Sequence, residues 1–224
     1  MHIPDGYLGP LTWGGAYAVM LPVWGLAARR VGRTLRSSQA PLMAMGAAFV
    51  FVVMMFNIPL GPTTGHATGA VLVAVLLGPW AAVLAVSVAL AIQAFLFGDG
   101  GITALGANCF NMAFLMPFAG YWVYRLVSWR SSVSSRRRWL GAAAAGYIAL
   151  NLAAASSAIM LGIQPILHRE ASGQPLYSPF PLGVALPVVA GEHLLLFGWV
   201  EAALTGLAVA YMQRAQPELL EATR

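Results

Sequence analysis

Residues 66–97 read HATGAVLVAVLLGPWAAVLAVSVALAIQAFLF, a stretch with no Asp, Glu, Lys or Arg. Uncharged apolar runs of this kind are typical of membrane helices. Because Gly78-Pro79 divides the run, it predicts two helices, over 66–77 and 79–97. The first would be about 18 Å long, too short for a hydrocarbon core of about 30 Å, and such a helix indicates a binding site or a re-entrant element. One long kinked helix over 66–97 is the alternative.

The rest of the chain has the composition of a multi-span membrane protein. Of its 224 residues, 59% are hydrophobic and 8% are charged, against about 25% charged in soluble domains. Further apolar runs predict helices over 10–28, 40–57, 103–125, 139–162 and 184–212. We therefore expect an all-α integral membrane protein with a seven-helix bundle. It forms a single membrane domain, 1–224, divided into an N-terminal segment 1–9, a bundle 10–212 and a tail 213–224.

The basic residues predict how this bundle is oriented. Every one of them is an arginine, and if seven helices alternate, eleven of the twelve fall on one side. These are Arg29, Arg30, Arg33, Arg36, Arg125, Arg130, Arg136, Arg137, Arg138, Arg214 and Arg224. Only Arg169 falls opposite, so the positive-inside rule predicts an outside N-terminus and a cytoplasmic C-terminus. The net charge of +5 thus indicates membrane orientation rather than nucleic-acid binding.

The lack of lysine and the presence of only one cysteine exclude several classes of site. The chain has no Lys, and a Walker A loop needs its Lys to reach the nucleotide phosphates, so a standard ATP-hydrolysing site is excluded. The single Cys109 excludes an internal disulfide and a Cys-rich zinc site.

The first eight residues, Met1-His2-Ile3-Pro4-Asp5-Gly6-Tyr7-Leu8, lack the basic start and cleavage site of a secretory signal, so we expect them in the mature protein. The Met1 amine, the His2 backbone nitrogen and the His2 Nδ1 can chelate one metal ion in fused small rings. With the amide ionised the set is nearly planar, which favours Cu(II) or Ni(II), and with less preference Co(II), over tetrahedral Zn(II). An ordinary start with a chance histidine is the alternative.

In the predicted topology the N-terminus and the loops 58–65, 98–102 and 163–183 share the outer face. His66 ends the segment Pro-Thr-Thr-Gly-His of residues 62–66, and its neutral imidazole is a natural fourth ligand. A loop histidine bonded to the backbone is the alternative. Asp99, in Gly-Asp-Gly-Gly, either accepts a hydrogen bond from a ligating histidine or caps a helix near residue 102. We expect His168 to be solvated.

Other polar residues lie within apolar runs. Asn108 and Asn111 share a helix face, where they either join helices or support a ligand loop. Glu192, His193 and Glu201 interrupt the last apolar run, and ionisable groups inside a span usually mark a site or a partner contact. The sequence assigns these three no role.

Together these motifs resemble the CbiM/NikM family, the substrate-binding membrane subunits of energy-coupling-factor transporters for cobalt and nickel. The likeness is close over about the first half and rests mainly on hydropathy thereafter, with a weaker match at 201–205. Its motifs are the first eight residues, Thr64-Gly65-His66, Leu77-Gly78-Pro79-Trp80, Gln93-Ala94-Phe95-Leu96-Phe97-Gly98-Asp99-Gly100-Gly101, Leu105-Gly106-Ala107-Asn108 and Asn111-Met112.

The resemblance implies a seven-helix S-component fold and one transported divalent ion, with no resident cofactor and no catalytic residue. It implies that the ligands are the Met1 amine, the amide and imidazole nitrogens of His2, and His66. Asp99, Asn108 and Asn111 match supporting positions. The implied partners are a transmembrane coupling subunit, two ATPase subunits and a small accessory membrane subunit, in a bacterial or archaeal cytoplasmic membrane.

The sequence thus predicts a subunit that captures Ni(II) or Co(II) outside the cell for ATP-driven import. A stand-alone divalent transition-metal permease would use the same residues without ATPases. An intramembrane hydrolase built on Glu192, His193 and His66 is a different class, and it lacks metalloprotease spacing. Sequence does not decide between nickel and cobalt, because both accept nitrogen ligands.

Overall fold

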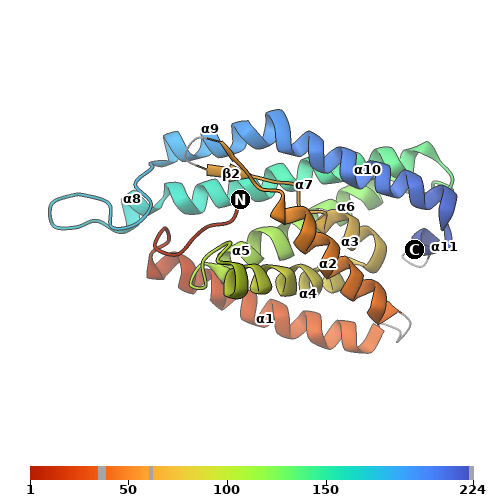
Figure 1. Ribbon diagram of the computed structural model, residues 1–224, viewed down its shortest axis with the longest axis horizontal. Coiled ribbons are helices and arrows are strands. Elements are labelled where there is room, and N and C mark those ends of the chain that lie inside the picture. Colours follow the sequence, from red (N-terminus) through yellow and green to blue (C-terminus); the bar gives the residue numbers. More distant parts are fainter. Residues whose placement is uncertain (35–38, 61–62, 222–224) are drawn as a thin grey trace.

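The computed structural model describes residues 1–34, 39–60 and 63–221 of the chain. Arg36, Pro62 and Arg224, which the sequence analysis uses, lie outside these residues. Most of the described chain is helical, as predicted, and the longer helices run side by side along the long axis of the molecule (Figure 1).

The long helices follow the predicted apolar runs, and three of them contain π-helical segments, named η. The first half of the chain forms α1 (Pro10–Thr34), α2 (Ala40–Met55), α3 (Ala70–Leu77), α4 (Pro79–Ile92), η2 (Gln93–Phe97), α5 (Leu105–Asn108), η3 (Cys109–Leu115) and α6 (Met116–Val127). The second half forms α7 (Arg136–Gly162), α8 (Gln164–Leu167), α9 (Leu182–Glu192), η4 (His193–Phe197), α10 (Gly198–Ala215) and α11 (Glu218–Glu221).

Four helical stretches of the described chain are long and apolar enough to cross a membrane. They are Pro10–Thr34, Pro79–Phe97, Arg136–Leu167 and Leu182–Ala215, and Ala40–Met55 is a shorter apolar helix. Many large apolar side chains on these helices are exposed, such as Leu195 at 81% and Leu207 at 67%. Lipid is the natural surrounding for such a surface, so the chain is a multi-pass membrane protein.

The helix predicted over 66–77 begins later, at Ala70. Gly69 has φ 71°, a left-handed conformation that an α-helix cannot contain. His66 therefore lies in an irregular segment before the helix, not within it. At the other end Gly78 has φ 83° and ψ 159°, so α3 and α4 are two helices rather than one kinked helix. Residues 70–76 are all buried, which makes α3 a short internal helix.

The predicted 58–65 loop contains a small antiparallel hairpin, which is the exception to the all-α prediction. Its strands are β1 (Ile58–Leu60) and β2 (Thr63–Gly65), with Ile58 opposite Gly65 in the register. The hairpin leads directly into His66.

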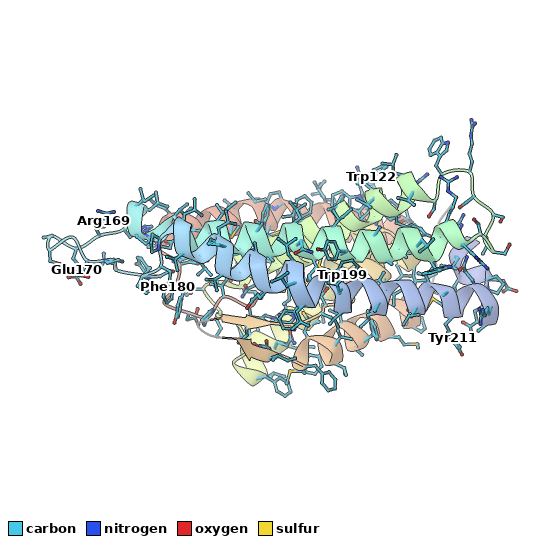
Figure 2. The ribbon with its side chains drawn as sticks, turned by 90° about the horizontal axis from the view of Figure 1, so that it is seen from above. Trp122, Arg169, Glu170, Phe180, Trp199 and Tyr211 are labelled. Carbon is cyan, nitrogen blue, oxygen red and sulfur yellow. The ribbon has the colours of Figure 1, made fainter. Side chains whose placement is uncertain are left out.

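The arginine-rich segments gather at one end of the molecule. The C-terminal end of α1, the connection from α6 to α7 and the end of α10 all lie at that end in Figure 1. Arg169 lies at the opposite end, on the long connection between α8 and α9 (Figure 2). The grouping that the sequence predicted from alternating helices is therefore present among the described arginines.

Candidate metal centre

The N-terminal segment 1–9 is inserted between the helices and bonded to several of them. The backbone N–H of Ile3 donates to Asn108 Oδ1 at 2.9 Å, and Asn108 Nδ2 donates to the Ile3 carbonyl at 3.0 Å. The Gly101 N–H also donates to that carbonyl, at 2.9 Å. The Asn108 side chain thus bonds both backbone groups of Ile3 and holds the segment in place. This is the supporting role that the sequence left open. In Figure 1 the N-terminus lies within the outline of the bundle, near β2, α5 and α7.

Asp5 fixes the next part of the segment. Its carboxylate accepts hydrogen bonds from the N–H groups of Ile102 and Thr103, at 3.0 and 2.8 Å, and from the Thr103 hydroxyl. These bonds, the hydroxyl's foremost, hold the pKa of Asp5 below its ordinary value. The sequence had offered Asp99 as the cap of a helix near residue 102. That alternative is wrong, because Asp5 already accepts from the amides at this position.

The Gly-Asp-Gly-Gly turn packs closely on the segment, and glycine is required there. Gly100 has φ 90°, and a Cβ on it would lie 3.1 Å from Asn108 Nδ2 and 3.3 Å from His2 Cδ2. A Cβ on Gly101 would lie 2.4 Å from the Asp5 backbone nitrogen. Side chains larger than glycine would therefore clash with the N-terminal segment at these two positions.

The Met1 amine is buried beside the hairpin. Met1 is 4% exposed, and its amine donates to the Thr64 carbonyl at 2.7 Å. Burial lowers the pKa of this amine from 8.0 to about 5, against the opposing effect of the Glu192 and Asp99 charges. At neutral pH the amine is consequently uncharged and keeps a lone pair that can bind a metal ion.

The two histidines of the proposed ligand set lie against each other. The His2 and His66 rings stack with centroids 4.7 Å apart and 22° between their planes. Burial and the neighbouring amine lower the pKa of His2 to about 3. Neither His2 ring nitrogen has a hydrogen-bond partner among the described residues, and Nδ1 lies 3.6 Å from Asp99 Oδ1. The imidazole is therefore neutral and available as a ligand.

His66 is fully buried and presents one free nitrogen. Its Nδ1 lies 3.0 Å from the Ala67 carbonyl oxygen, which only accepts, so Nδ1 carries the proton. Its Nε2 is buried and has no hydrogen-bond partner within the described chain. The two sequence interpretations of His66, backbone-bonded loop residue and ligand, are compatible, because the backbone bond leaves Nε2 unprotonated.

Asn111 is less closely tied to the segment than Asn108. It is fully buried, and its Nδ2 lies 3.5 Å from Met160 Sδ on α7, a distance typical of weak sulfur contacts. This contact joins two helices, in keeping with the helix-joining alternative.

Glu201 has a structural role that the sequence did not assign. It is fully buried on α10, and its carboxylate accepts from the N–H groups of Thr68 at 2.7 Å and Gly69 at 3.1 Å. These amides directly follow His66 and precede α3, so Glu201 fixes the turn that positions the imidazole. Its position within an apolar run was the only signal in the sequence.

Glu192 and His193 come closer to the centre than their sequence positions suggested. Glu192 lies near enough to the Met1 amine for its charge to oppose the lowering of the amine's pKa. Glu192 Oε1 and His193 Nε2 are both buried and have no hydrogen-bond partner in the described chain. His193 also packs on Phe197, centroids 5.4 Å apart, and Phe197 closes over Gly65. The end of α9 thus borders the centre.

A cavity of about 180 Å³ reaches the centre from the side of α9, and Pro4, Tyr7 and Val188 help to line it. His2 and Thr64 also line it, so this cavity reaches one of the two stacked imidazoles. His168, which the sequence predicted to be solvated, is only partly exposed. Its ring lies against Gly9, where a Cβ would approach it to 2.4 Å, and stands edge-on to Tyr177 at 5.1 Å.

The metal donors available here are nitrogen atoms, and two of them belong to the backbone and the chain terminus rather than to side chains. Among the residues that the structure describes, no three His, Cys, Asp or Glu side chains gather closely enough to hold a metal ion. The nitrogen donors present at this position are the two imidazoles, the terminal amine and the His2 backbone nitrogen. Such nitrogen sets suit Ni(II), Cu(II) and Co(II).

Comparison with known proteins points the same way. The family model described as "Cobalt uptake substrate-specific transmembrane region" (CbiM) matches residues 2–219. The chain is 50% identical to the fused nickel transport protein NikMN of Rhodobacter capsulatus, with all of this chain and 65% of that protein covered. It is 46% identical to the probable fused nickel transport protein LarMN of Lactiplantibacillus plantarum, again with all of this chain and 67% of that protein covered.

The chain thus spans about two thirds of the length of these relatives. A crystal structure of a truncated transition metal transporter superposes with a TM-score of 0.91 at 50% identity. That match covers 96% of this chain and 99% of the other.

Proposed function

The chain belongs to the CbiM family of cobalt uptake transmembrane regions, and from this premise we propose that it is the ion-capturing membrane subunit of an energy-coupling-factor ABC transporter. Its cargo is Ni(II) or Co(II). Membership makes it a nickel or cobalt transport membrane protein. The finer proposal adds the ligand set, the orientation and the partners.

One observation carries the proposal of the ligand set. The Met1 amine, the His2 imidazole and His66 Nε2 are buried together, each with a lone pair that the described residues leave free. Burying polar nitrogens without partners is unfavourable, and a metal ion that accepts all three removes that cost. The His2 backbone nitrogen, which lies between the amine and the imidazole in the chain, completes a planar set of four.

Asp99 supports this set at its edge. Its carboxylate lies 3.6 Å from His2 Nδ1, and its side chain is 26% exposed. Once Nδ1 binds the ion, the ring proton is carried by Nε2. Asp99 then acts on the centre through its charge, which opposes the positive charge of the incoming ion.

We further propose that the ion enters from outside through the cavity beside α9. The grouped arginines support an orientation with the N-terminus outside, a seven-helix bundle and the tail in the cytoplasm. Binding to the already neutral amine releases no proton there, whereas ionising the His2 amide releases one, so affinity rises with pH. A coupling subunit, two ATPase subunits and an accessory subunit then drive import across the cytoplasmic membrane, and this chain performs no covalent chemistry.

The test is a one-residue extension before Met1, which converts the terminal amine into an internal amide. Calorimetric titration of the purified, untagged chain should show one tight Ni(II) or Co(II) site, and the extended chain should show none. A matched control extends the C-terminus by one residue and should bind normally. Tight binding by the N-terminally extended chain would refute the ligand set. Metal uptake by liposomes that contain this chain alone would favour a permease over an ATP-driven subunit.

A further inference from the structure

A second cavity, of about 620 Å³, opens at the arginine-rich end of the molecule, and the proposed function does not use it. It lies where α6 passes into α7, far from the N-terminal segment (Figure 1). Cavities of this size accommodate small organic ligands. Its polar lining includes Tyr121, Tyr124, Arg125, Ser128, Arg130 and Arg138.

The floor of this cavity contains polar atoms without partners. Arg138 is 6% exposed, and it donates from Nη1 to the Tyr124 hydroxyl at 3.1 Å and from Nη2 to the Ser131 carbonyl at 3.3 Å. Its Nε is buried and has no hydrogen-bond partner among the described residues. The same holds for the hydroxyl of Ser128, a residue that is 6% exposed. A guanidinium offers five donors and no acceptor, so this site is built to receive an acceptor.

The cavity is also positively charged. Arg125 and Arg130 stand exposed at its rim, and Arg125 donates to the Tyr121 hydroxyl at 3.3 Å. The described chain contains two ion pairs, His2 with Asp99 and His193 with Glu192. Neither involves an arginine of the cavity. A buried cation without a counter-ion is unfavourable. Three arginines around one cavity therefore favour an anion with several acceptor oxygens, and phosphate geometry suits guanidinium groups best.

An exposed apolar wall adjoins the cavity: Trp129 lines it, and Trp122 and Leu126 directly follow the lining residues Tyr121 and Arg125 on α6. Trp122, Leu126 and Trp129 are 60%, 76% and 60% exposed, and Figure 2 shows Trp122 projecting from this end of α6. Exposed tryptophans at the end of a membrane helix are typical of the boundary between headgroups and hydrocarbon. A free anion would need only the arginines, whereas a lipid would use both the arginines and this apolar wall.

We propose that this cavity binds the phosphodiester of an anionic phospholipid. Arg138 and Ser128 hold the phosphate from below, Arg125 and Arg130 hold it from the rim, and the acyl chains lie along α6 beside Trp122 and Leu126. Cationic pockets between membrane helices recognise lipid headgroups by this combination of charge and depth.

The test compares lipids and variants of the full-length chain in neutral detergent. Thermal unfolding is followed by tryptophan fluorescence with added phosphatidylglycerol, phosphatidylcholine or inorganic phosphate. The main variant is Arg125→Gln with Arg130→Gln, which spares the buried guanidinium. Arg138→Gln is a second variant. The control is Arg33→Gln, an exposed arginine in the last turn of α1 that does not line the cavity.

Phosphatidylglycerol should raise the melting temperature of the native chain and of the control more than phosphatidylcholine does. Each lost rim arginine should weaken the apparent lipid affinity about fivefold, and Arg138→Gln should abolish the difference between the lipids. If Arg138→Gln does not fold, the double variant decides. Equal effects of the two lipids, or an unchanged response of the double variant, would overturn the proposal. Stabilisation by inorganic phosphate alone would overturn it in favour of a free anion.

Discussion

Lowering the pH should release the N-terminal segment from the bundle. The pH dependence of this release follows from the pKa values of two buried groups, the Met1 amine and the His2 imidazole. The Met1 amine has a pKa of about 5 when docked and 8.0 when free, and His2 has values of about 3 and 6.5. The docked segment therefore binds fewer protons than the released one, so its stability is present at high pH and is lost as the pH falls. From pH 8 to 6.5 the amine takes up most of the proton on release, and the His2 imidazole contributes only near the lower end of this range.

The expected magnitude follows from these values. Because the free amine is already half-protonated at pH 8, its further protonation down to pH 6.5 changes the docking equilibrium roughly 16-fold, or by about 1.6 kcal/mol. Below pH 6.5 the His2 imidazole also takes up a proton, so the dependence on pH should double in slope until about pH 5, where the docked amine itself becomes protonated.

Hydrogen exchange measures this equilibrium directly in the metal-free protein. The Ile3 amide, which donates to Asn108, reports opening of the segment, and the Gly78 amide, which donates to Ala74, reports the bundle. After correction for intrinsic exchange, the opening free energy at Ile3 should fall with acid while that at Gly78 stays constant. An N-terminally acetylated chain should lose most of this slope above pH 6.5. A constant or rising opening free energy at Ile3 between pH 8 and 6.5 would show that the buried amine is not the titrating group.

Three substitutions test other contacts of the centre. His66→Ala removes a proposed ligand and should weaken Ni(II) binding in calorimetry by more than the roughly 10–100-fold typical of supporting residues, whereas His168→Ala should change it less than about twofold; similar losses would mean that the wrong histidine was chosen. Asn108→Ala should weaken binding about 10–100-fold while Asn151→Ala, on α7, leaves it intact. Glu201→Ala leaves two buried amides without an acceptor and should lower the free energy of unfolding by about 1–3 kcal/mol, and full restoration of stability by Leu rather than Gln would contradict that role.

The helices could be predicted because apolar runs and proline breaks set their positions. The run 79–97 coincides with α4 and η2, and the division at Gly78 is where the sequence predicted it. The late start of α3 could not be read from the chain, since Gly69 in a left-handed conformation and its carboxylate partner Glu201 are fixed by tertiary contacts. The hairpin could not be predicted either, because each of its strands has only three residues and no alternating pattern of apolar and polar residues.

The site was predictable where its chemistry is local and not where it depends on distant pairs. The amine, amide and imidazole of Met1 and His2 are adjacent in sequence, so their chelating geometry follows from the covalent chain. By contrast, the sequence offered Asp99 as a cap near residue 102, and only the fold shows that Asp5 accepts from the Ile102 amide. The sequence assigned His193 no role, although an ionisable residue within an apolar run usually marks a site or a partner contact.

The three π-helical segments of the described chain limit which insertions and deletions the protein can tolerate during evolution. Gln93, Asn111 and His193 each lie in one of them, and a π-turn contains one residue more than the α-turn it replaces. Deleting a single residue there would restore a regular helix and rotate everything beyond it by about 100°. Substitutions can therefore accumulate along these helices, whereas selection should remove insertions and deletions within the three π-helical segments. A relative whose chain differs in length within one of these segments is expected to lack this centre.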